Sequence, residues 1–291
     1  MADRAIAIGF WVNAVLMTMK LLAGHFGHSD AVFADGVESG ADFIAILASM
    51  IALKIGRRPL DDDHPYGHGK AESIAAILVS LIIFATGGGI LFKAVTTVLD
   101  RDYGAPQLIA VLAAVATILI KEAMFRYTRK VSRKLQSPAV EAIAMDHRKD
   151  ALTSLITVIG VGGAYLGAGV MDHLAAGLTA LFIGHIGWQT FRNAANDLMD
   201  IQPPKELITA VTAIAEGVHG VEHVHEIRSR RSGQYLIVDL KLDMDPEMTV
   251  KQSHGITTDV KRLFFERFPN VGDVMIHINP HDEEHEDLIR L

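Results

Sequence analysis

Long apolar stretches dominate the first two thirds of the chain, whereas the last third alternates between short apolar and polar runs. Each apolar stretch holds about twenty or more residues, which is enough for a helix to cross a hydrocarbon core of ~30 Å. We therefore predict an α-helical membrane protein with six transmembrane helices. The predicted spans are Ala5–Phe26, Ala31–Ile55, Ala71–Leu99, Gln107–Tyr127, Ala139–Leu166 and Met171–Ala195.

The pattern changes after Asp200-Ile201-Gln202-Pro203-Pro204, where two prolines follow the last apolar stretch. Beyond this point, the periodicity predicts a helix, two strands joined by a turn at Ser232-Gly233, a second helix and a last strand. Their ranges are Pro204–Glu216, His223–Arg230, Tyr235–Met244, Thr249–Phe268 and Asp273–Ile278. We expect residues 1–200 to form the transmembrane domain, and residues 201–291 to form a small cytoplasmic α+β domain of the ferredoxin-like kind.

Positive charge in the connections predicts the orientation in the membrane. Two connections are rich in lysine and arginine: Lys54, Arg57, Arg58 and Lys70 in one, and Arg126, Arg129, Lys130, Arg133 and Lys134 in the other. The alternate connections carry only Arg101. The basic connections are therefore expected to face the cytoplasm, and with six spans both termini face it too.

Composition narrows the possible function classes. The 291 residues are 50% apolar and carry a formal net charge of −7, which argues against a nucleic-acid partner. The sequence has no cysteine, so disulfides and thiolate metal sites are excluded, and most of its 14 histidines lie outside the apolar stretches. The N-terminus lacks a basic region followed by a small-residue cleavage site, so we expect its apolar stretch to be a retained span.

Two pairs of acidic residues interrupt the apolar stretches. Glu38 and Asp42 lie four residues apart in the second stretch, and Asp146 and Asp150 lie four apart in the fifth. Residues at this spacing share one face of a helix. A carboxylate within a bilayer costs a few kcal/mol, so it faces a partner, a cavity or an ion. We interpret the four carboxylates as ligands of one cation; interhelical hydrogen bonding is the alternative.

The depth of the pairs supports this interpretation. Asp42 lies ~18 Å from the outer end of its span at helical rise. The fifth span is predicted to begin at Ser137-Pro138, an N-cap followed by proline, which places Asp150 at a similar depth from the inner end. Asp35 is left outside the site, as a helix cap or part of an outer vestibule. His147 is either a further ligand or a partner of the ligands.

The connection between the second and third spans contains a second candidate site. Asp61, His64 and His68 supply oxygen and nitrogen donors within eight residues, which is enough for a divalent ion. The alternative is a solvated acidic loop. Gly69-Lys70 does not complete a phosphate-binding loop, because Ala71 replaces the required Ser or Thr. No nucleotide is therefore expected as a partner.

Histidines recur on the predicted strands and helix of the last ninety residues. A lone histidine there is more often a surface or packed side chain than a ligand. These histidines are His225, His254 and His277, and Asp239 lies on the second predicted strand.

Together, these features resemble the cation diffusion facilitator family over nearly the whole chain. The most specific match is His64-Pro65-Tyr66-Gly67-His68-Gly69-Lys70-Ala71-Glu72, which is similar to the loop signature of the family. The resemblance implies a transport site at Glu38, Asp42, Asp146 and Asp150, a loop site at Asp61, His64 and His68, and cytoplasmic metal positions at His225, Asp239, His254 and His277. It also implies a homodimer that exchanges a divalent cation for protons, with Lys70 and Asp200 in a charged contact at the dimer junction.

The departures from the family pattern bear on the metal. Zinc members carry His or Asp first in span two and His first in span five, where this chain has Glu38 and Asp146. Asn279 replaces a bridging aspartate found in some relatives, which argues against a two-metal cluster in the cytoplasmic domain. Because oxygen ligands suit harder ions, we expect Mn²⁺ or Fe²⁺ as the substrate and regulator, with Zn²⁺ left open.

The predicted function is proton-coupled efflux, in which metal and protons compete for the same carboxylates. The alternative is a membrane-anchored metal sensor or scaffold without transport. An intramembrane metalloenzyme would need a general base, and no His-Glu-x-x-His motif occurs, so neither enzyme activity nor catalytic residues are expected. The partner subunit is a second copy or a paralogue, and the membrane is a bacterial inner membrane or that of an organelle.

Overall fold

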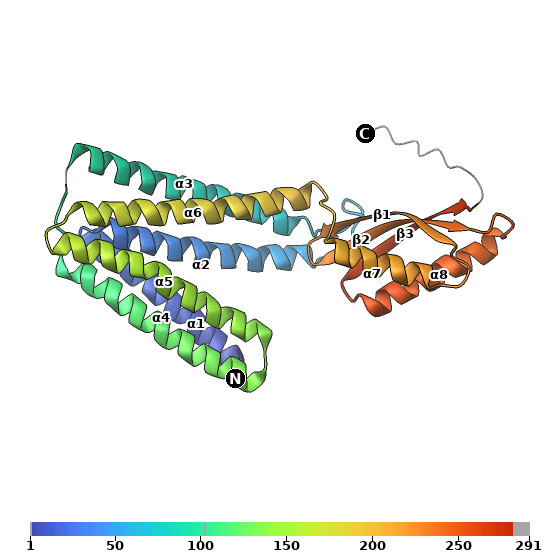
Figure 1. Ribbon diagram of the computed structural model, residues 1–291, viewed down its shortest axis with the longest axis horizontal. Coiled ribbons are helices and arrows are strands. Elements are labelled where there is room, and N and C mark those ends of the chain that lie inside the picture. Colours follow the sequence, from blue (N-terminus) through green and yellow to red (C-terminus); the bar gives the residue numbers. More distant parts are fainter. Residues whose placement is uncertain (1, 102, 282–291) are drawn as a thin grey trace. The chain divides into compact units, whose positions relative to one another are not determined.

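A computed structural model describes residues 2–101 and 103–281. The chain divides into two compact units (Figure 1). The membrane unit comprises residues 1–48 and 76–191, and the C-terminal unit comprises residues 49–75 and 192–291. Family and structure agree on a helical membrane region and a small α+β region, whereas the proposed boundary at residue 200 stays a prediction.

The six long helices lie where the apolar stretches predict them. They are α1 (Ala2–Phe26), α2 (Asp30–Gly56), α3 (Ala71–Asp100), α4 (Leu108–Leu135), α5 (Pro138–Tyr165) and α6 (Val170–Leu198). Five of them are long and apolar enough to cross a membrane. The sixth helix, α5, is long enough but less apolar, because it contains the run Asp146–Asp150, with five polar or charged side chains in a row. This polar run makes α5 the helix on which the candidate chemistry concentrates.

Helix ends follow local signals in the sequence. Ser137 caps α5, since its side chain accepts a hydrogen bond from the amide of Val140, and Pro138 occupies the first turn. Helix α4 continues to Leu135, past the predicted end at Tyr127. Half of the residues beyond Tyr127 are Arg or Lys, which favour helix about as strongly as Leu does. The apolar pattern therefore indicated where the helix leaves the membrane and not where it ends.

Small residues allow the membrane helices to approach closely. A Cβ atom on Gly24 of α1 would lie 2.5 Å from the backbone nitrogen of Phe33 in α2, so only glycine fits there. Helix α3 packs on α6 through Val79, Ile83 and Ile183, which are all buried. Interfaces rich in small residues are typical of helices in membranes.

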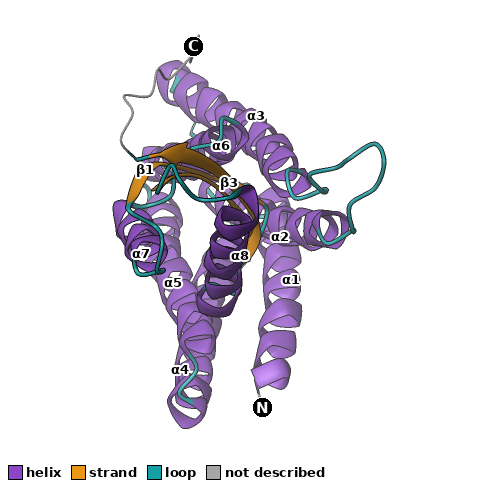
Figure 2. Cartoon of the chain, turned by 90° about the vertical axis from the view of Figure 1, so that its right-hand side faces the viewer, coloured by secondary structure: helices purple, strands orange, loops and turns teal. Residues whose placement is uncertain are grey.

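The C-terminal unit is a three-stranded sheet covered by two helices on one face. The strands are β1 (His223–Ser232), β2 (Tyr235–Met244) and β3 (Val271–Pro280), and the helices are α7 (Lys205–Glu216) and α8 (Val250–Arg267). Strand β2 is central, antiparallel to β1 and parallel to β3. Figure 2 shows the sheet with its helices. This arrangement confirms the predicted α+β class.

Alternation along β2 decides which side chains face the helices. Val238, Leu240 and Leu242 point into the core with Val260 and Phe264 of α8. Because successive strand residues face opposite sides, Asp239, Lys241 and Asp243 share the face away from the helices. The polar residues of the sheet are thus displayed together, on the side that the core does not use.

Helix α8 begins with a capping box, and its removal should destabilise the helix locally. The Thr249 hydroxyl accepts from the amide of Gln252, and the Gln252 side chain accepts from the amide of Thr249 at 2.9 Å. Thr249→Ala should cost about 1 kcal/mol. Amide hydrogen exchange in α8 of the full-length protein should then accelerate about fivefold. Thr258→Ala, at an exposed position inside the same helix, should leave the exchange nearly unchanged.

Candidate metal centre

A polar cavity lies between α1, α2, α4 and α5 within the membrane unit. Three of the four predicted carboxylates line it: Asp42 from α2, and Asp146 and Asp150 from α5. The cavity encloses about 220 Å³. A water molecule occupies ~30 Å³ of liquid, so a cation with part of its hydration shell has room. The four-residue spacing and matching depth read from the sequence do bring α2 and α5 acids to one cavity.

The fourth predicted carboxylate, Glu38, does not line the cavity. Glu38 is only 8% exposed and lies one turn before Asp42 on α2. Its charge is within electrostatic reach of Asp35, Asp42 and Lys20. Glu38 is therefore a buried neighbour of the cavity, one helical turn from its lining residues.

Two buried lysines face the acidic residues, and the sequence analysis missed both. Lys121 of α4 is 4% exposed. Its ammonium donates to Asp150 Oδ2 at 2.5 Å and to Asn13 Oδ1 at 2.8 Å. Both lysines could have been found in the sequence, because each is a charged residue within an apolar stretch, as the acidic pairs are. A protein ammonium thus occupies one side of Asp150.

The second lysine forms a similar network, which meets the lining of the cavity only at Ser39. Lys20 of α1 is 1% exposed and donates to Asp35 Oδ1 at 2.9 Å and to Ser39 Oγ at 3.0 Å. The Ser154 hydroxyl of α5 also donates to Asp35, at 3.2 Å. Asp35 is therefore satisfied by protein groups, and it is not a helix cap, because it lies buried inside α2.

The remaining cavity groups are available to a ligand. Within residues 2–101 and 103–281, neither Asp42 nor Asp146 has a Lys, Arg or His nitrogen within 4.0 Å. His147 lines the same cavity, and both of its ring nitrogens are buried without a hydrogen-bond partner. Buried polar atoms are rarely left unsatisfied without a functional reason. The cavity thus offers two unpaired carboxylates, one lysine-paired carboxylate and an imidazole.

The loop triad, Asp61, His64 and His68, forms a compact cluster in the C-terminal unit. One donor atom from each residue lies within 4.8 Å of the others, and no other such group of His, Asp and Glu occurs among the described residues. Asp61 Oδ1 is 3.0 Å from His64 Nδ1, and Asp61 Oδ2 is 3.3 Å from His68 Nε2. The structure therefore brings all three predicted loop residues together.

Hydrogen bonding prepares Asp61 for a cation. Partial desolvation would raise the pKa of Asp61, but hydrogen bonds from the ring and the amide of His64 outweigh it and hold the pKa below its usual value. The carboxylate therefore stays ionised well below neutral pH, and protons displace a bound cation from it only in acid.

Removal of the two loop imidazoles should abolish a distinct metal-binding event. We expect the double variant His64→Ala/His68→Ala to bind about one Zn²⁺ fewer per chain than the unmodified protein, since imidazole suits zinc. Equilibrium dialysis with metal analysis measures this number. His219→Ala removes an isolated exposed histidine of the same unit and should change nothing. Equal zinc binding by the double variant would show that the cluster is only a solvated loop.

The four predicted positions of the C-terminal domain are not gathered in one chain. Asp239 lies 4.0 Å from Arg230 (Oδ2 to Nη1), and His254 and His277 are exposed. His225 instead lies 3.8 Å from Asp243 (Nδ1 to Oδ2), a residue that the sequence analysis did not single out. The assignment of these four residues to a metal site stays a prediction.

Asp243 and its neighbour Asn279 form a buried polar pair. Asn279 Nδ2 donates to Asp243 Oδ1 at 3.3 Å, and both residues are 6% exposed.

Lys70 has its predicted acidic partner within the same chain. Its ammonium donates to Asp200 Oδ1 at 2.6 Å and to the carbonyl of Asp197 at 2.5 Å.

Membrane helices enclosing an acidic cavity, joined to a small α+β domain, define a polytopic membrane protein that handles cations. The chain matches two family descriptions along its length: "Cation efflux transmembrane domain" at residues 6–199 and "Cation efflux protein, cytoplasmic domain" at residues 203–281. The chain belongs to the cation efflux family, and the predicted resemblance to cation diffusion facilitators is confirmed. Members of this family are transporters that export divalent metal cations, and the matched cytoplasmic domain is their dimerisation domain.

Several curated relatives match along most of their length. The manganese efflux system protein MneP of Bacillus subtilis (strain 168) is 34% identical over 290 residues, which covers 97% of either chain. MneS, a second manganese efflux system protein of that strain, is 30% identical over 270 residues, covering 93% of this chain and 92% of the relative. The magnetosome protein MamB of Magnetospira sp. (strain QH-2) is 31% identical over 278 residues, covering 96% and 95%.

Proposed function

We propose that this chain exports Mn²⁺ or Fe²⁺ in exchange for protons, and that the cavity between α2 and α5 is its transport site. The observation that carries this proposal is the convergence of Asp42, Asp146 and Asp150 on one cavity inside the membrane unit. Unpaired carboxylates in a membrane helix mark an ion pathway. Membership of the cation efflux family supports the divalent charge of the ion.

The ligand set consists of carboxylates from two helices. Asp42 and Asp146 bind the metal directly, because neither has a basic partner within the described chain. Asp150 binds the metal as well once the Lys121 ammonium releases the Asp150 carboxylate oxygen. Glu38 contributes from the neighbouring turn, either as a fourth ligand or by accepting the proton that the metal displaces. His147 is the nitrogen donor that a softer ion would recruit.

Chemical hardness and the relatives favour the same metals. Carboxylate oxygens suit Mn²⁺, and a mixed oxygen and nitrogen set suits Fe²⁺ and Zn²⁺. MneP and MneS are named for manganese efflux. Manganese and iron are therefore the proposed substrates, with zinc as the alternative.

Proton coupling follows from the chemistry of the ligands. Carboxylates bind a divalent metal only when they are deprotonated, so loading of the metal releases protons and reprotonation releases the metal. Exchange between two access states of the helices would carry the site from one side of the membrane to the other, each ligand favouring the state to which it binds better.

The C-terminal unit is proposed to sense the metal and to hold the dimer. In this proposal the loop triad binds a regulatory ion, and His225, Asp239, His254 and His277 complete a second set between two subunits. The subunits are two copies of this chain, or this chain and a paralogue. Both termini lie in the cytoplasm, consistent with the basic connections.

Metal flux in proteoliposomes tests the transport proposal. Mn²⁺, Fe²⁺ and Zn²⁺ are offered separately under an imposed pH gradient, to the unmodified protein, to Asp146→Ala, and to Asp100→Ala as a matched exposed carboxylate. We expect proton-linked Mn²⁺ or Fe²⁺ flux that Asp146→Ala abolishes and Asp100→Ala retains. Flux of zinc alone would overturn the metal assignment, and no flux of any metal would favour a sensor or scaffold.

A further inference from the structure

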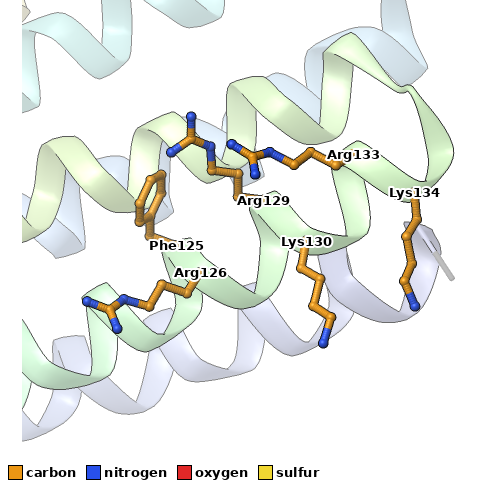
Figure 3. Close-up of a pocket in the computed structure, with 6 residues that line it drawn as sticks. All are labelled: Phe125, Arg126, Arg129, Lys130, Arg133 and Lys134. Carbon is orange, nitrogen blue, oxygen red and sulfur yellow. The ribbon is translucent and has the colours of Figure 1, made fainter.

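The C-terminal end of α4, which we propose to face the cytoplasm, carries two parallel rows of side chains with five positive charges in total. One row is Phe125, Arg129 and Arg133, and the other is Arg126, Lys130 and Lys134; together they line a groove (Figure 3). Residues four apart form ridges along a helix, so the groove runs between two neighbouring ridges. We propose that this groove binds the phosphate headgroup of an anionic phospholipid in the leaflet that meets the C-terminal end of α4.

Most of the charge in the groove is not neutralised by the protein. Among residues 2–101 and 103–281, no carboxylate lies within 4.0 Å of Lys130, Arg133 or Lys134. Arg126 pairs with Glu122 at 2.8 Å, and Arg129 lies 3.6 Å from Glu141. Three uncompensated cations on two turns of helix form a surface that attracts an anion from the membrane.

Arg129 provides a donor that makes no hydrogen bond. Its Nε atom is buried, and its nearest acidic group, Glu141 Oε1, lies 3.6 Å away, beyond hydrogen-bond distance. Its guanidinium lies over the ring of Phe125, 5.4 Å from the ring centre, and this contact holds the guanidinium in place. A positioned guanidinium matches the geometry of two phosphate oxygens. A phosphate in the groove would satisfy the orphaned donor.

The length of α4 places the groove at the level of lipid headgroups. The helix has 28 residues, whereas about 20 suffice for the hydrocarbon core. When Leu108 marks one edge of that core, the other edge falls near the start of the basic rows, and Phe125 lies at the boundary. Arginine and lysine side chains at such a boundary extend toward the headgroups.

The same side of α4 provides a surface for the acyl chains. Four residues follow one another at intervals of seven, which is close to two helical turns, so they lie on one side of α4. They are Leu112, Leu119, Arg126 and Arg133. Leu112 is 60% exposed and Leu119 is 65% exposed. An exposed apolar stripe that continues into cationic side chains fits a molecule with an anionic head and an apolar tail. A soluble phosphate would use only the head of this surface.

The side chains, and not the backbone, must provide the binding. The C-terminal end of a helix carries a partial negative charge, which disfavours an anion. Neutralising the groove residues should therefore remove binding.

Lipid retention by the purified full-length protein tests this inference. Native mass spectrometry compares bound phosphatidylglycerol with bound phosphatidylcholine, for the unmodified protein and for a variant with Arg129, Lys130, Arg133 and Lys134 all changed to Gln. The matched control is Arg57→Gln/Arg58→Gln, an exposed basic pair beyond the end of α2. We expect at least about tenfold preference for phosphatidylglycerol, lost in the groove variant and kept in the control.

Three results would overturn the inference. Equal retention of the two lipids would show that the groove does not select an anionic head. Equal loss in the control pair would show diffuse attraction in place of a site. Complete displacement of phosphatidylglycerol by millimolar inorganic phosphate would identify a site for a soluble anion. Zinc binding at the loop triad, measured on the same preparations, verifies that the groove variant is folded.

Discussion

Replacing Asp150 with alanine is expected to lower metal flux through the reconstituted protein by more than about 100-fold, because even outer-shell partners of a bound metal contribute 10–100-fold. Asp150 is one of three carboxylates that line the cavity and the only one of them paired with a lysine of the described chain. Its removal takes away one proposed ligand and leaves the Lys121 ammonium beside the two others. That ammonium would then compete with the metal at the remaining carboxylates.

An asparagine variant separates loss of function from loss of fold. Asp150→Asn keeps the size of the side chain and leaves an amide oxygen that can still accept from Lys121. It should remain folded, as judged by size-exclusion chromatography and by zinc binding at the loop triad, and yet transport as poorly as Asp150→Ala. Normal Mn²⁺ flux in Asp150→Asn would show that this carboxylate is not a transport ligand.

The elements that could be predicted from the sequence are those set by short-range patterns. Apolar stretches located all six long helices, although the polar run Asp146–Asp150 interrupts that of α5, and Ser137 with Pro138 located the start of α5. The spacing of Asp61, His64 and His68 within one loop was enough to foresee their cluster. Matching depth brought Asp42 and Asp150 to one cavity. Each of these predictions depends on residues close in sequence or on a distance along a single helix.

The partners across helices could not be predicted, because they depend on how each helix is rotated about its axis. The sequence places Lys20 and Lys121 within apolar spans but does not indicate which acid each one faces. The pairing of Lys121 with Asp150, and of Lys20 with Asp35, appears only when α1, α4, α2 and α5 are packed. Glu38 shares a face of α2 with Asp42 but lies one helical turn away along the axis, beyond the lining of the cavity.

Strand register imposed a similar limit in the C-terminal unit. Asp239 and Asp243 are four residues apart on β2 and face the same side of the sheet, so alternation cannot tell which of them is next to His225. The ladder between β1 and β2 shifts between Val224 and Glu226, which leaves His225 as the extra residue of a bulge. Bulges re-aim side chains, and this one puts His225 beside Asp243.

Replacing Lys121 with methionine should tighten metal binding and destabilise the empty protein. Lys121 donates to Asp150 at 2.5 Å in a buried ion pair, and removing one member of such a pair costs about 3–5 kcal/mol. Metal that binds Asp150 no longer has to displace an ammonium. We expect KM for Mn²⁺ to fall about tenfold or more, corresponding to about 1.4 kcal/mol. The turnover number should fall as well, because a more tightly held ion leaves more slowly.

Lys20 offers a control matched in burial and chemistry. Lys20→Met breaks a pair with Asp35 that is buried even more deeply, and Asp35 lies outside the lining of the cavity. Thermal unfolding in detergent should show both variants to be destabilised without metal, whereas Mn²⁺ should restore Lys121→Met far more than Lys20→Met, since only the former frees a cavity carboxylate. If KM falls equally in both, the cause is the loss of buried positive charge in general, and Lys121 is not the competitor of the metal at Asp150.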